Sequence, residues 1–303
     1  MRILPLTACL ALLLSLFPIA QASLSFDTAR GLFEQNHFPE AETALREVIK
    51  GEPTNAAAYH YLARTIIARM TKEKPTKEEA EARIKEVVQW ITRATELEPN
   101  NAAYLRDFGM SQIAGVTSLK KGRKILEQAL ALDPKDVDTH EFLALLYSAP
   151  WIMGGDKDKA KEHRRALQQL DPARGALAEI DYLIWNEKDF PAAFTLAESL
   201  LKKDPDSALG HYLYGYVAAE SKTNLERGLA SLKKGLELPR VESIGNSAYS
   251  QPMKTTPSFF WHQIGKIERE LGHLDAARTA FTTAVTLDPG NHWAATDLAK
   301  LKS

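Results

Sequence analysis

The feature that most constrains the fold of this 303-residue chain is a proline that recurs at a nearly regular spacing. Most of these prolines follow an acidic residue and one follows a leucine: Glu52-Pro53, Glu98-Pro99, Asp133-Pro134, Asp171-Pro172, Asp204-Pro205, Leu238-Pro239 and Asp288-Pro289. Successive prolines lie 46, 35, 38, 33, 34 and 50 residues apart. Because proline disfavours helix at the residue before it, each one marks the end of a helical run. The spacing therefore predicts a repeat with insertions in some of its loops.

Within each unit the apolar residues indicate two helices joined by a turn. Residues 258–289 are the last full unit, with Gly272 at the turn. Its two apolar stripes are Trp261, Ile264 and Gly265, then Ala277, Phe281 and Ala284. Small residues suit places where two helices approach closely, and large residues fill wider gaps. The pattern therefore predicts stacked helical hairpins.

This pattern resembles the tetratricopeptide repeat (TPR) family over roughly residues 23–303. The resemblance implies an all-α, right-handed TPR superhelix (an α-solenoid) of about seven helix-turn-helix units, whose first helices line a concave groove. The expected starts of these first helices are Ser25, Ala56, Ala102, Val137, Gly175, Leu209 and Ser258. A half-helix, Asn291 to Lys300, is expected to cap the last apolar face. An irregular helical bundle is the alternative, but it does not explain the regular prolines.

Two units depart from the family pattern. Gly228 and Gly235 occupy second-helix positions where alanine is more usual, and Glu268 places a charge on a stripe that is normally apolar. Because a single unit cannot bury its apolar face alone, we expect all units to share one continuous apolar spine.

The first 22 residues have the three parts of a secretory signal peptide: Arg2, an apolar run from Leu6 to Phe17, and small residues before an expected cleavage after Ala22. The run of about 12 residues is shorter than the roughly 20 needed to span a bilayer. The alternatives are an uncleaved anchor and lipid attachment at Cys9. We expect a periplasmic protein, secreted across the inner membrane of a Gram-negative-type cell, with no transmembrane span or thiol in the mature chain.

The expected organisation has four parts: residues 1–22 as signal peptide, 23–239 as units 1–6, 240–257 as a loop or linker, and 258–303 as unit 7 with the capping helix. The 240–257 loop is rich in Ser, Thr, Gly and Pro, and long loops of this kind are often functional. We expect its Tyr249 and Met253 to fold back onto the groove. The charged residues 69–86 are expected to form a long, solvated connection between the helices of unit 2.

Composition and motifs argue against several classes of function. Lys plus Arg number 38 and Asp plus Glu number 39, whereas nucleic-acid-binding proteins are normally basic. The sequence has no phosphate-binding GxxxxGK[ST] loop, no GxGxxG, no GxSxG elbow and no HExxH motif. Asp136 and Asp138 are interpreted as a helix cap, since an EF-hand calcium loop needs other residues at fixed offsets. We therefore predict no catalytic residue, metal site or cofactor; a hydrolase on a helical array is the outlying alternative.

The inward stripes of the first helices supply the binding candidates. The aromatic candidates, expected to form one wall, are Tyr182, Trp185, Tyr212 and Tyr216; the arginines, expected to line up for an acidic segment or carboxylate, are Arg30, Arg64 and Arg106; the last unit adds His262 and Lys266. The alternatives are rings that pack between helices and arginines that pair with nearby glutamates.

A second candidate site is the loop inside unit 4. Its candidates are Trp151, Gly154, Gly155 and Asp156. The glycines permit a left-handed backbone, and Asp156 is expected to cap a helix that begins near Lys157. We expect Trp151 and Met153 to pack over the adjacent unit. The loop is either a structural turn or a ligand contact.

Together these features predict a non-enzymatic scaffold or adaptor that binds a protein segment in its groove, in cell-envelope assembly. Its expected partner is a protein or peptide of the cell envelope, not a nucleic acid. The alternative is a small-molecule-binding partner of a solute transporter, which requires a closed, deep apolar cavity.

Overall fold

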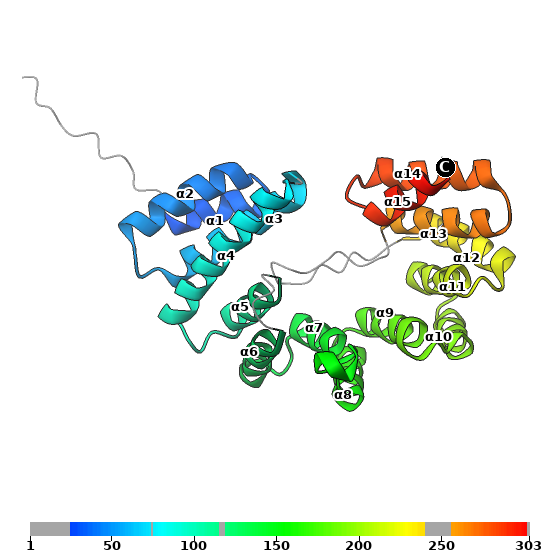
Figure 1. The fold of residues 1–303 in the computed structure, drawn as a ribbon, viewed down its shortest axis with the longest axis horizontal. Helices are drawn as coiled ribbons and strands as arrows, with labels where there is room; N and C mark the ends of the chain where they lie inside the picture. Colours follow the sequence, from blue (N-terminus) through cyan, green and yellow to red (C-terminus); the bar gives the residue numbers. More distant parts are fainter. Residues whose placement is uncertain (1–24, 74, 115–118, 240–255, 302–303) are drawn as a thin grey trace, which may run out of the picture.

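The computed structural model describes residues 25–73, 75–114, 119–239 and 256–301, and this part of the chain is built from α-helices (Figure 1). The helices are α1 (Phe26–Glu34), α2 (Phe38–Gly51), α3 (Ala56–Glu73), α4 (Lys77–Leu97), α5 (Ala102–Ala114), α6 (Leu119–Leu132), α7 (Val137–Tyr147), α8 (Lys157–Leu170), α9 (Pro172–Tyr182), α10 (Phe190–Lys203), α11 (Ala208–Ser221), α12 (Leu225–Glu237), α13 (Pro257–Glu270), α14 (Leu274–Leu287) and α15 (His292–Lys300). A 3-10 turn, η1 (Trp151–Met153), precedes α8, and a π-helical turn, η2 (Leu183–Glu187), extends α9.

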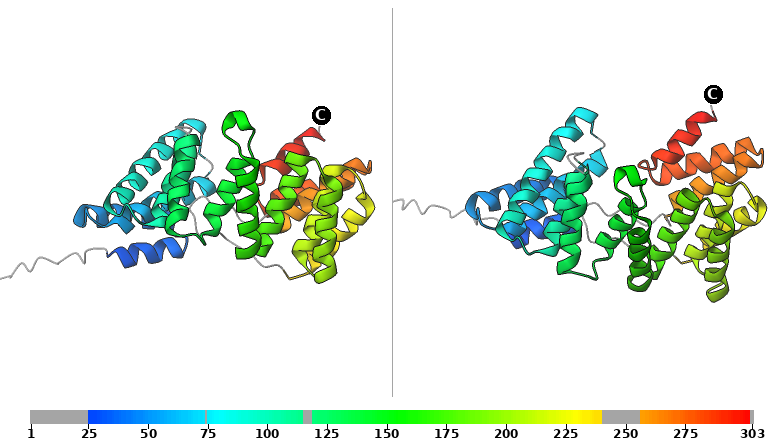
Figure 2. Two further views of the ribbon diagram at one scale, coloured as in Figure 1. Left: turned by 90° about the horizontal axis from the view of Figure 1, so that it is seen from below. Right: turned by 60° about the horizontal axis from the view of Figure 1, so that its bottom comes forward.

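Consecutive helices pair into seven hairpins that stack in chain order along an arc (Figures 1 and 2). In the middle of the arc, α5, α7 and α9 lie on its inner side and α6, α8 and α10 on its outer side (Figure 1). The predicted α-solenoid is confirmed. Six of the predicted first helices begin within one residue of the expected position, while α9 begins at Pro172 and not at Gly175. The half-helix α15 begins after Asn291, whose side chain accepts a hydrogen bond from the amide of Ala294.

The acid-proline pairs end helices, as the spacing predicts. Glu52, Glu98, Asp204 and Asp288 each occupy the residue just after a helix. Asp171 does more, because it follows α8 directly and also caps α9 by accepting hydrogen bonds from the amides of Ala173 and Arg174. Pro172 is the first residue of α9, where its missing amide hydrogen costs nothing. This shared cap explains the early start of α9.

The charged insertion of the second hairpin lengthens its helices. The prediction of a long solvated connection at residues 69–86 is wrong, because α3 continues to Glu73 and α4 begins at Lys77. Thr76 and Glu79 form a reciprocal capping box at this start. The leader and residues 240–255, with Tyr249 and Met253, lie outside the described residues.

The departures in the last two hairpins have physical reasons. A side chain on Gly228 would lie 2.4 Å from Ala218, and one on Gly235 would lie 2.5 Å from the ring of Phe260. Glycine at these positions therefore lets α12 approach α11 and α13 more closely than alanine would. Glu268 is buried, but His273 Nδ1 lies 2.8 Å from its carboxylate, so the charge has a partner.

The apolar core is divided, and the expectation of one continuous spine is wrong. One cluster joins α1–α4 with Tyr104 of α5, a second lies between α5 and α8, and the third and largest runs from α9 to α14. Each hairpin pair still buries apolar area on both helices, which is the main favourable term in folding.

Buried ion pairs also join neighbouring hairpins. Arg106 of α5 is buried, and its guanidinium contacts Asp107 Oδ1 at 3.1 Å and Asp136 Oδ2 at 2.5 Å. Asp136 is also the cap of α7, as predicted, since it accepts from the amide of Thr139. Arg174 of α9 pairs with Asp138 at 2.8 Å and with Glu141. A buried charge is costly unless it is paired, so each junction depends on both partners.

Replacement of Gly265 by alanine is predicted to destabilise the last hairpin. The new methyl carbon would lie 2.5 Å from ring atoms of the fully buried Phe281. We expect a loss of about 1–3 kcal/mol in the free energy of unfolding, measured by urea denaturation. Gly31→Ala is the matched control, because its nearest neighbour would be 4.0 Å away, and helix propensity should make it stabilising by about 0.5–1 kcal/mol. Equal effects of the two substitutions would contradict the prediction.

Candidate functional site

The three candidate arginines do not form a row. Arg30 is partly exposed and pairs with Asp27 at 3.3 Å and Glu34 at 3.5 Å, both on its own helix. Arg106 is buried in the junction described above. Of the three, only Arg64 keeps a guanidinium that forms no ion pair with the described residues. The expected line of arginines is therefore wrong, because neighbouring carboxylates take two of its members.

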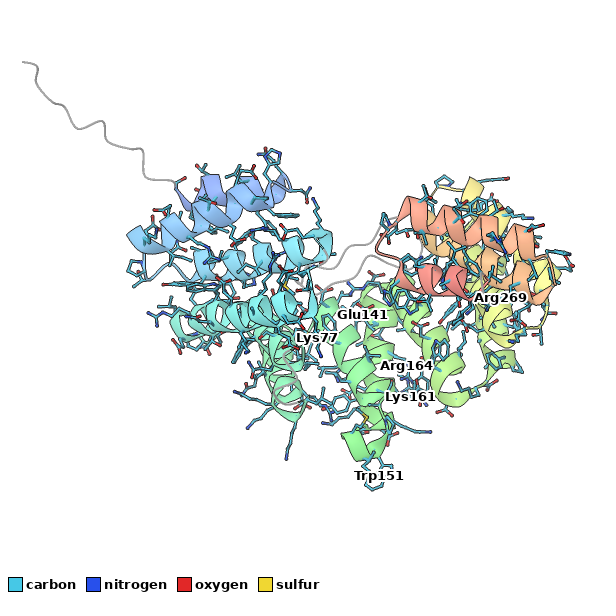
Figure 3. The ribbon with its side chains drawn as sticks, turned by 45° about the horizontal axis from the view of Figure 1, so that its top comes forward. Lys77, Glu141, Trp151, Lys161, Arg164 and Arg269 are labelled. Atoms are coloured by element: carbon cyan, nitrogen blue, oxygen red, sulfur yellow. The ribbon has the colours of Figure 1, made fainter. Side chains whose placement is uncertain are left out.

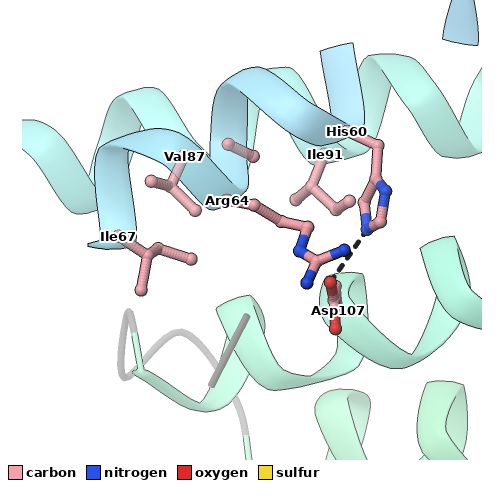
Figure 4. Close-up of a pocket in the computed structure, with 7 residues that line it drawn as sticks. His60, Arg64, Ile67, Val87, Ile91 and Asp107 are labelled. Atoms are coloured by element: carbon pink, nitrogen blue, oxygen red, sulfur yellow. Dashed lines mark hydrogen bonds and ion pairs between the residues drawn. The ribbon is translucent and has the colours of Figure 1, made fainter. Parts of the chain in front are cut away.

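Arg64 is held by aromatic rings. Its guanidinium lies 5.2 Å from the ring centre of Phe33 and 5.5 Å from that of Tyr61, which is the geometry of a cation–π contact. Its Nε is buried and has no hydrogen-bond partner. The residue lines a hollow too narrow for a water molecule, beside the 2.8 Å contact between His60 Nε2 and Asp107 Oδ2 (Figure 4). Arg64 is thus a fixed cation at the surface of an inner helix.

Three of the four candidate aromatic residues are packed inside the protein. Tyr182, Tyr212 and Tyr216 are buried, so the expected exposed aromatic wall is wrong for three of its four members. Burial raises the pKa of the Tyr212 and Tyr216 hydroxyls well above the usual value for tyrosine. Tyr212 stacks between Tyr216 and Phe260, with ring centres 5.9 and 5.1 Å away. These rings join neighbouring hairpins, which is the alternative interpretation of the cluster.

Trp185 is the exposed member of the cluster. Its side chain lies in η2 at the end of α9 and 55% of the residue's surface is exposed. The indole Nε1 donates to the hydroxyl of Tyr216 at 2.8 Å, and that hydroxyl donates to Asp181 at 2.8 Å. Asn186 donates to the carbonyl oxygen of Ser148 at 2.6 Å and so ties η2 to the end of α7. The ring is held in one orientation, with Lys188 Nζ 5.1 Å from its centre, and about half of the residue's surface stays exposed.

An exposed leucine accompanies Trp185 on the neighbouring inner helix. Leu145 of α7 has 70% of its surface exposed. It lies one helical turn beyond Glu141, which Figure 3 places on the inner side of the arc, and residues four apart share a helix face. Large apolar side chains that remain exposed on adjacent elements are typical of contact surfaces.

The candidates of the last hairpin hold helices together. His262 is buried, and its Nε2 lies 3.0 Å from Asp297 Oδ2 on α15. Burial alone would raise the pKa of Asp297, but hydrogen bonds from His262 and Lys300 and the charge of Arg269 outweigh burial and hold that pKa well below its usual range. Lys266 pairs with Glu220 of α11 and is largely buried. Their geometry is that of structural contacts.

The loop inside the fourth hairpin has the predicted backbone but not the predicted packing. Gly154 has a φ of +83°, and Asp156 accepts hydrogen bonds from the amides of Asp158 and Lys159 at the start of α8. A side chain on Gly155 would lie 1.6 Å from the carbonyl oxygen of Ala149. The expectation that Trp151 and Met153 pack over the adjacent unit is wrong, because both are exposed.

Other classes of site find little support in the described residues. Within residues 25–73, 75–114, 119–239 and 256–301, no three His, Cys, Asp or Glu side chains gather as metal ligands would. None of the helices described in these ranges combines the length and apolar character that crossing a bilayer requires. Besides the hollow at Arg64, an open hollow of about 380 Å³ lies beside Tyr59 and Trp90. Neither is the closed, deep apolar cavity that a small-molecule carrier requires.

Two histidines are buried between α7 and α8. His140 Nδ1 lies 3.0 Å from His163 Nδ1, and His140 Nε2 donates to the carbonyl oxygen of Pro134 at 3.1 Å. In the neutral pair His140 therefore accepts the proton that His163 donates. The ring of Tyr147 stacks on His163 with centres 5.7 Å apart. Burial, followed by the charge of His140, lowers the pKa of His163 to about 4.

Comparison with family models identifies tetratricopeptide repeats at two places. One model of this repeat matches residues 26–69 and another matches residues 260–291. These ranges fall in the first hairpin with most of α3 and in the last hairpin, where the sequence pattern already indicates the repeat. The matching models describe a repeat and name no catalytic activity. No curated protein matches the chain.

Solved structures of other repeat proteins share the fold. A tetratricopeptide repeat protein from Parabacteroides merdae superimposes with a TM-score of 0.64 at 12% identity, covering 91% of this chain and 97% of that one. Yeast Tom70 gives 0.61 at 16% identity, covering 88% of this chain and 51% of Tom70. The C-terminal part of a TPR repeat-containing protein from Cytophaga hutchinsonii gives 0.51 at 12%, covering 90% and 99%. At these identities the likeness concerns the fold alone.

The buried histidine pair predicts a loss of stability in mild acid. An unfolded chain protonates His163 near pH 6.5, but the folded chain does so only near pH 4. The unfolded state therefore binds more protons between these values, so stability is complete above about pH 6.5 and falls by up to about 3 kcal/mol toward pH 4. Urea denaturation across this range measures the loss. His163→Gln should flatten the dependence of the free energy of unfolding on pH, whereas His292→Gln, at an exposed position, should leave it unchanged. Identical slopes of this free energy against pH in the wild type and both variants would contradict the prediction.

Proposed function

We propose that this tetratricopeptide repeat protein is a non-enzymatic scaffold that binds a protein segment along the inner side of its arc. The proposal includes export to the periplasm, directed by residues 1–22 as a signal peptide, and a role in cell-envelope assembly. The repeat fold supports the scaffold role, because such solenoids offer extended surfaces made of successive helices. The Arg2, Leu6–Phe17 and Ala22 pattern supports export.

The observation that carries the scaffold proposal is Trp185. A protein normally covers a tryptophan or leaves it free to move, whereas this indole is hydrogen-bonded to Tyr216 and still half-exposed. A fixed aromatic face loses little conformational entropy on binding, which is why such side chains act as anchors. Leu145 is also exposed and lies on α7, whose end is bonded to η2 through Asn186. We infer that a partner's apolar side chain covers Trp185.

The second candidate function, a small-molecule partner of a solute transporter, is weaker. It requires a cavity that encloses its ligand, and the hollows at Arg64 and beside Trp90 are respectively too small and too open for that.

Truncation of Trp185 is predicted to weaken partner binding. A partner recovered from envelope extracts of the source cell with the wild-type chain, and then purified, should bind Trp185→Ala roughly 30-fold more weakly, since loss of an anchor costs about 2 kcal/mol. Trp293→Ala is the matched control, because Trp293 is similarly exposed but lies on α15. Titration calorimetry measures both affinities. If Trp185→Ala recovers every partner as well as the wild type does, the inner-side site is wrong.

Arg64 is predicted to contact an acidic group of the bound segment. Arg64→Gln should weaken binding by roughly tenfold, because a guanidinium free of carboxylates and fixed on aromatic rings is prepared for an anion. Arg30→Gln should change the affinity by no more than about twofold, because exposed pairs such as those with Asp27 and Glu34 contribute little. Calorimetry at two salt concentrations tests both variants. Equal losses for the two would contradict a specific role for Arg64.

A further inference from the structure

The turn between α7 and α8 carries the most exposed apolar side chains that the structure describes. Of the large hydrophobic residues, Trp151 is 84% exposed and Ile152 is 78% exposed, and Met153 beside them is also exposed. Figure 3 shows Trp151 at the tip of the turn that closes the fourth hairpin, projecting away from the helices. Exposed apolar residues that are contiguous, unlike scattered single ones, indicate a contact.

Other hairpins of the chain are closed by short polar turns. Residues Gln35–His37 join α1 to α2, and Lys222–Asn224 join α11 to α12. The fourth hairpin instead uses residues 148–156 for the same connection. A turn that only connects two helices does not need an added Trp-Ile-Met segment, so the segment requires another explanation.

The backbone of this turn is fixed although its side chains are free. The amides of Met153 and Gly154 donate to the carbonyls of Pro150 and Trp151, both at 2.8 Å. Arg123 of α6 donates to the carbonyl oxygens of Gly154 and Met153, and its guanidinium lies 4.8 Å from the ring centre of Tyr147. The conformation that presents Trp151 is therefore formed before any partner arrives.

Positive charge surrounds the apolar tip. Because Arg123 is hydrogen-bonded to Gly154, the first half of α6 lies beside the turn. Lys120 and Lys124, in that half of the helix, are exposed. Residues 119–127 and 150–161 together carry seven Lys or Arg and three Asp or Glu, a formal charge of +4 in a chain whose total is −1. Of the three acids, Asp156 caps α8 and Glu127 pairs with Lys159 at 3.1 Å, which leaves Asp158 as the acid without such a role.

We propose that residues 151–153, hereafter the apolar tip, insert into the surface of a membrane that contains anionic phospholipids. Tryptophan favours the boundary between headgroups and acyl chains, where its ring is buried and its N–H stays hydrated. Isoleucine and methionine supply apolar area, while the lysines of α6 meet the phosphate groups. The chain is held on the membrane surface at one point and does not cross it.

Sedimentation with lipid vesicles tests the proposal. The purified chain should bind vesicles containing phosphatidylglycerol more tightly than vesicles of phosphatidylcholine alone, and the difference should shrink as salt is raised. Trp151→Ala should weaken binding to the anionic vesicles by roughly tenfold or more. Lys120→Gln with Lys124→Gln should weaken it by about fivefold per lysine. All three side chains are exposed, so the variants should melt at the wild-type temperature.

Trp185→Ala is the matched control, since it removes an exposed tryptophan from the inner side and should bind vesicles as the wild type does. All variants share the apolar run Leu6–Phe17, so differences among them report on the tip alone. Lipids with a quencher on the acyl chain should quench Trp151, and this quenching should vanish in Trp151→Ala but not in Trp185→Ala.

Three results would overturn the proposal. The first is no preference of the wild type for anionic vesicles, and the second is equal binding by Trp151→Ala and the wild type. The third is Trp151→Ala losing a soluble protein partner while vesicle binding is unchanged, which would make the tip a protein anchor. Failure of the inner-side scaffold would appear separately, as unchanged partner binding by Trp185→Ala.

Discussion

The buried ion pairs between repeats are the interaction on which the rest of this solenoid depends. The three apolar clusters stop at α5 and again between α8 and α9. Arg106 joins α5 to the start of α7, Arg174 joins α9 to α7, and each contacts two carboxylates. A guanidinium between carboxylates has a directional geometry that apolar contacts lack. The pairs therefore set the orientation of neighbouring hairpins, while the clusters supply most of the burial.

The architecture could be predicted from sequence because it follows from local rules. A proline just beyond a helical run marks its end, and glycine or alanine marks a close approach, so the number, order and starting points of the hairpins follow without any tertiary information. Where α9 begins early, the reason is also local, since Asp171 caps it immediately. The burial of Arg106 is not local, because it depends on a carboxylate of the next hairpin, that of Asp136.

The candidate site was predicted less well, for a related reason. A helical projection gives the direction of a side chain but not how closely the next hairpin packs. Tyr212 and Tyr216 have the direction expected for a groove, yet Phe260 and the neighbouring helices cover them. Trp185 escapes this covering because α9 ends in a π turn, where the register changes by one residue. No periodicity in the sequence signals that turn. The hydrogen bond from Trp185 to Tyr216 could not be foreseen either.

Trp185 and Trp151 lie in two segments that are bonded to each other, and this bears on how the two proposals combine. Asn186 beside Trp185 is bonded to Ser148, so the inner-side anchor is joined to the same chain segment that leads into the turn carrying Trp151. Tyr147, the last residue of α7, stabilises the start of this segment, because its ring contacts Arg123 and His163. These contacts fix the segment of Trp185 against the segment that leads to Trp151. A protein segment bound at Trp185 would then be held close to the membrane surface that the apolar tip contacts.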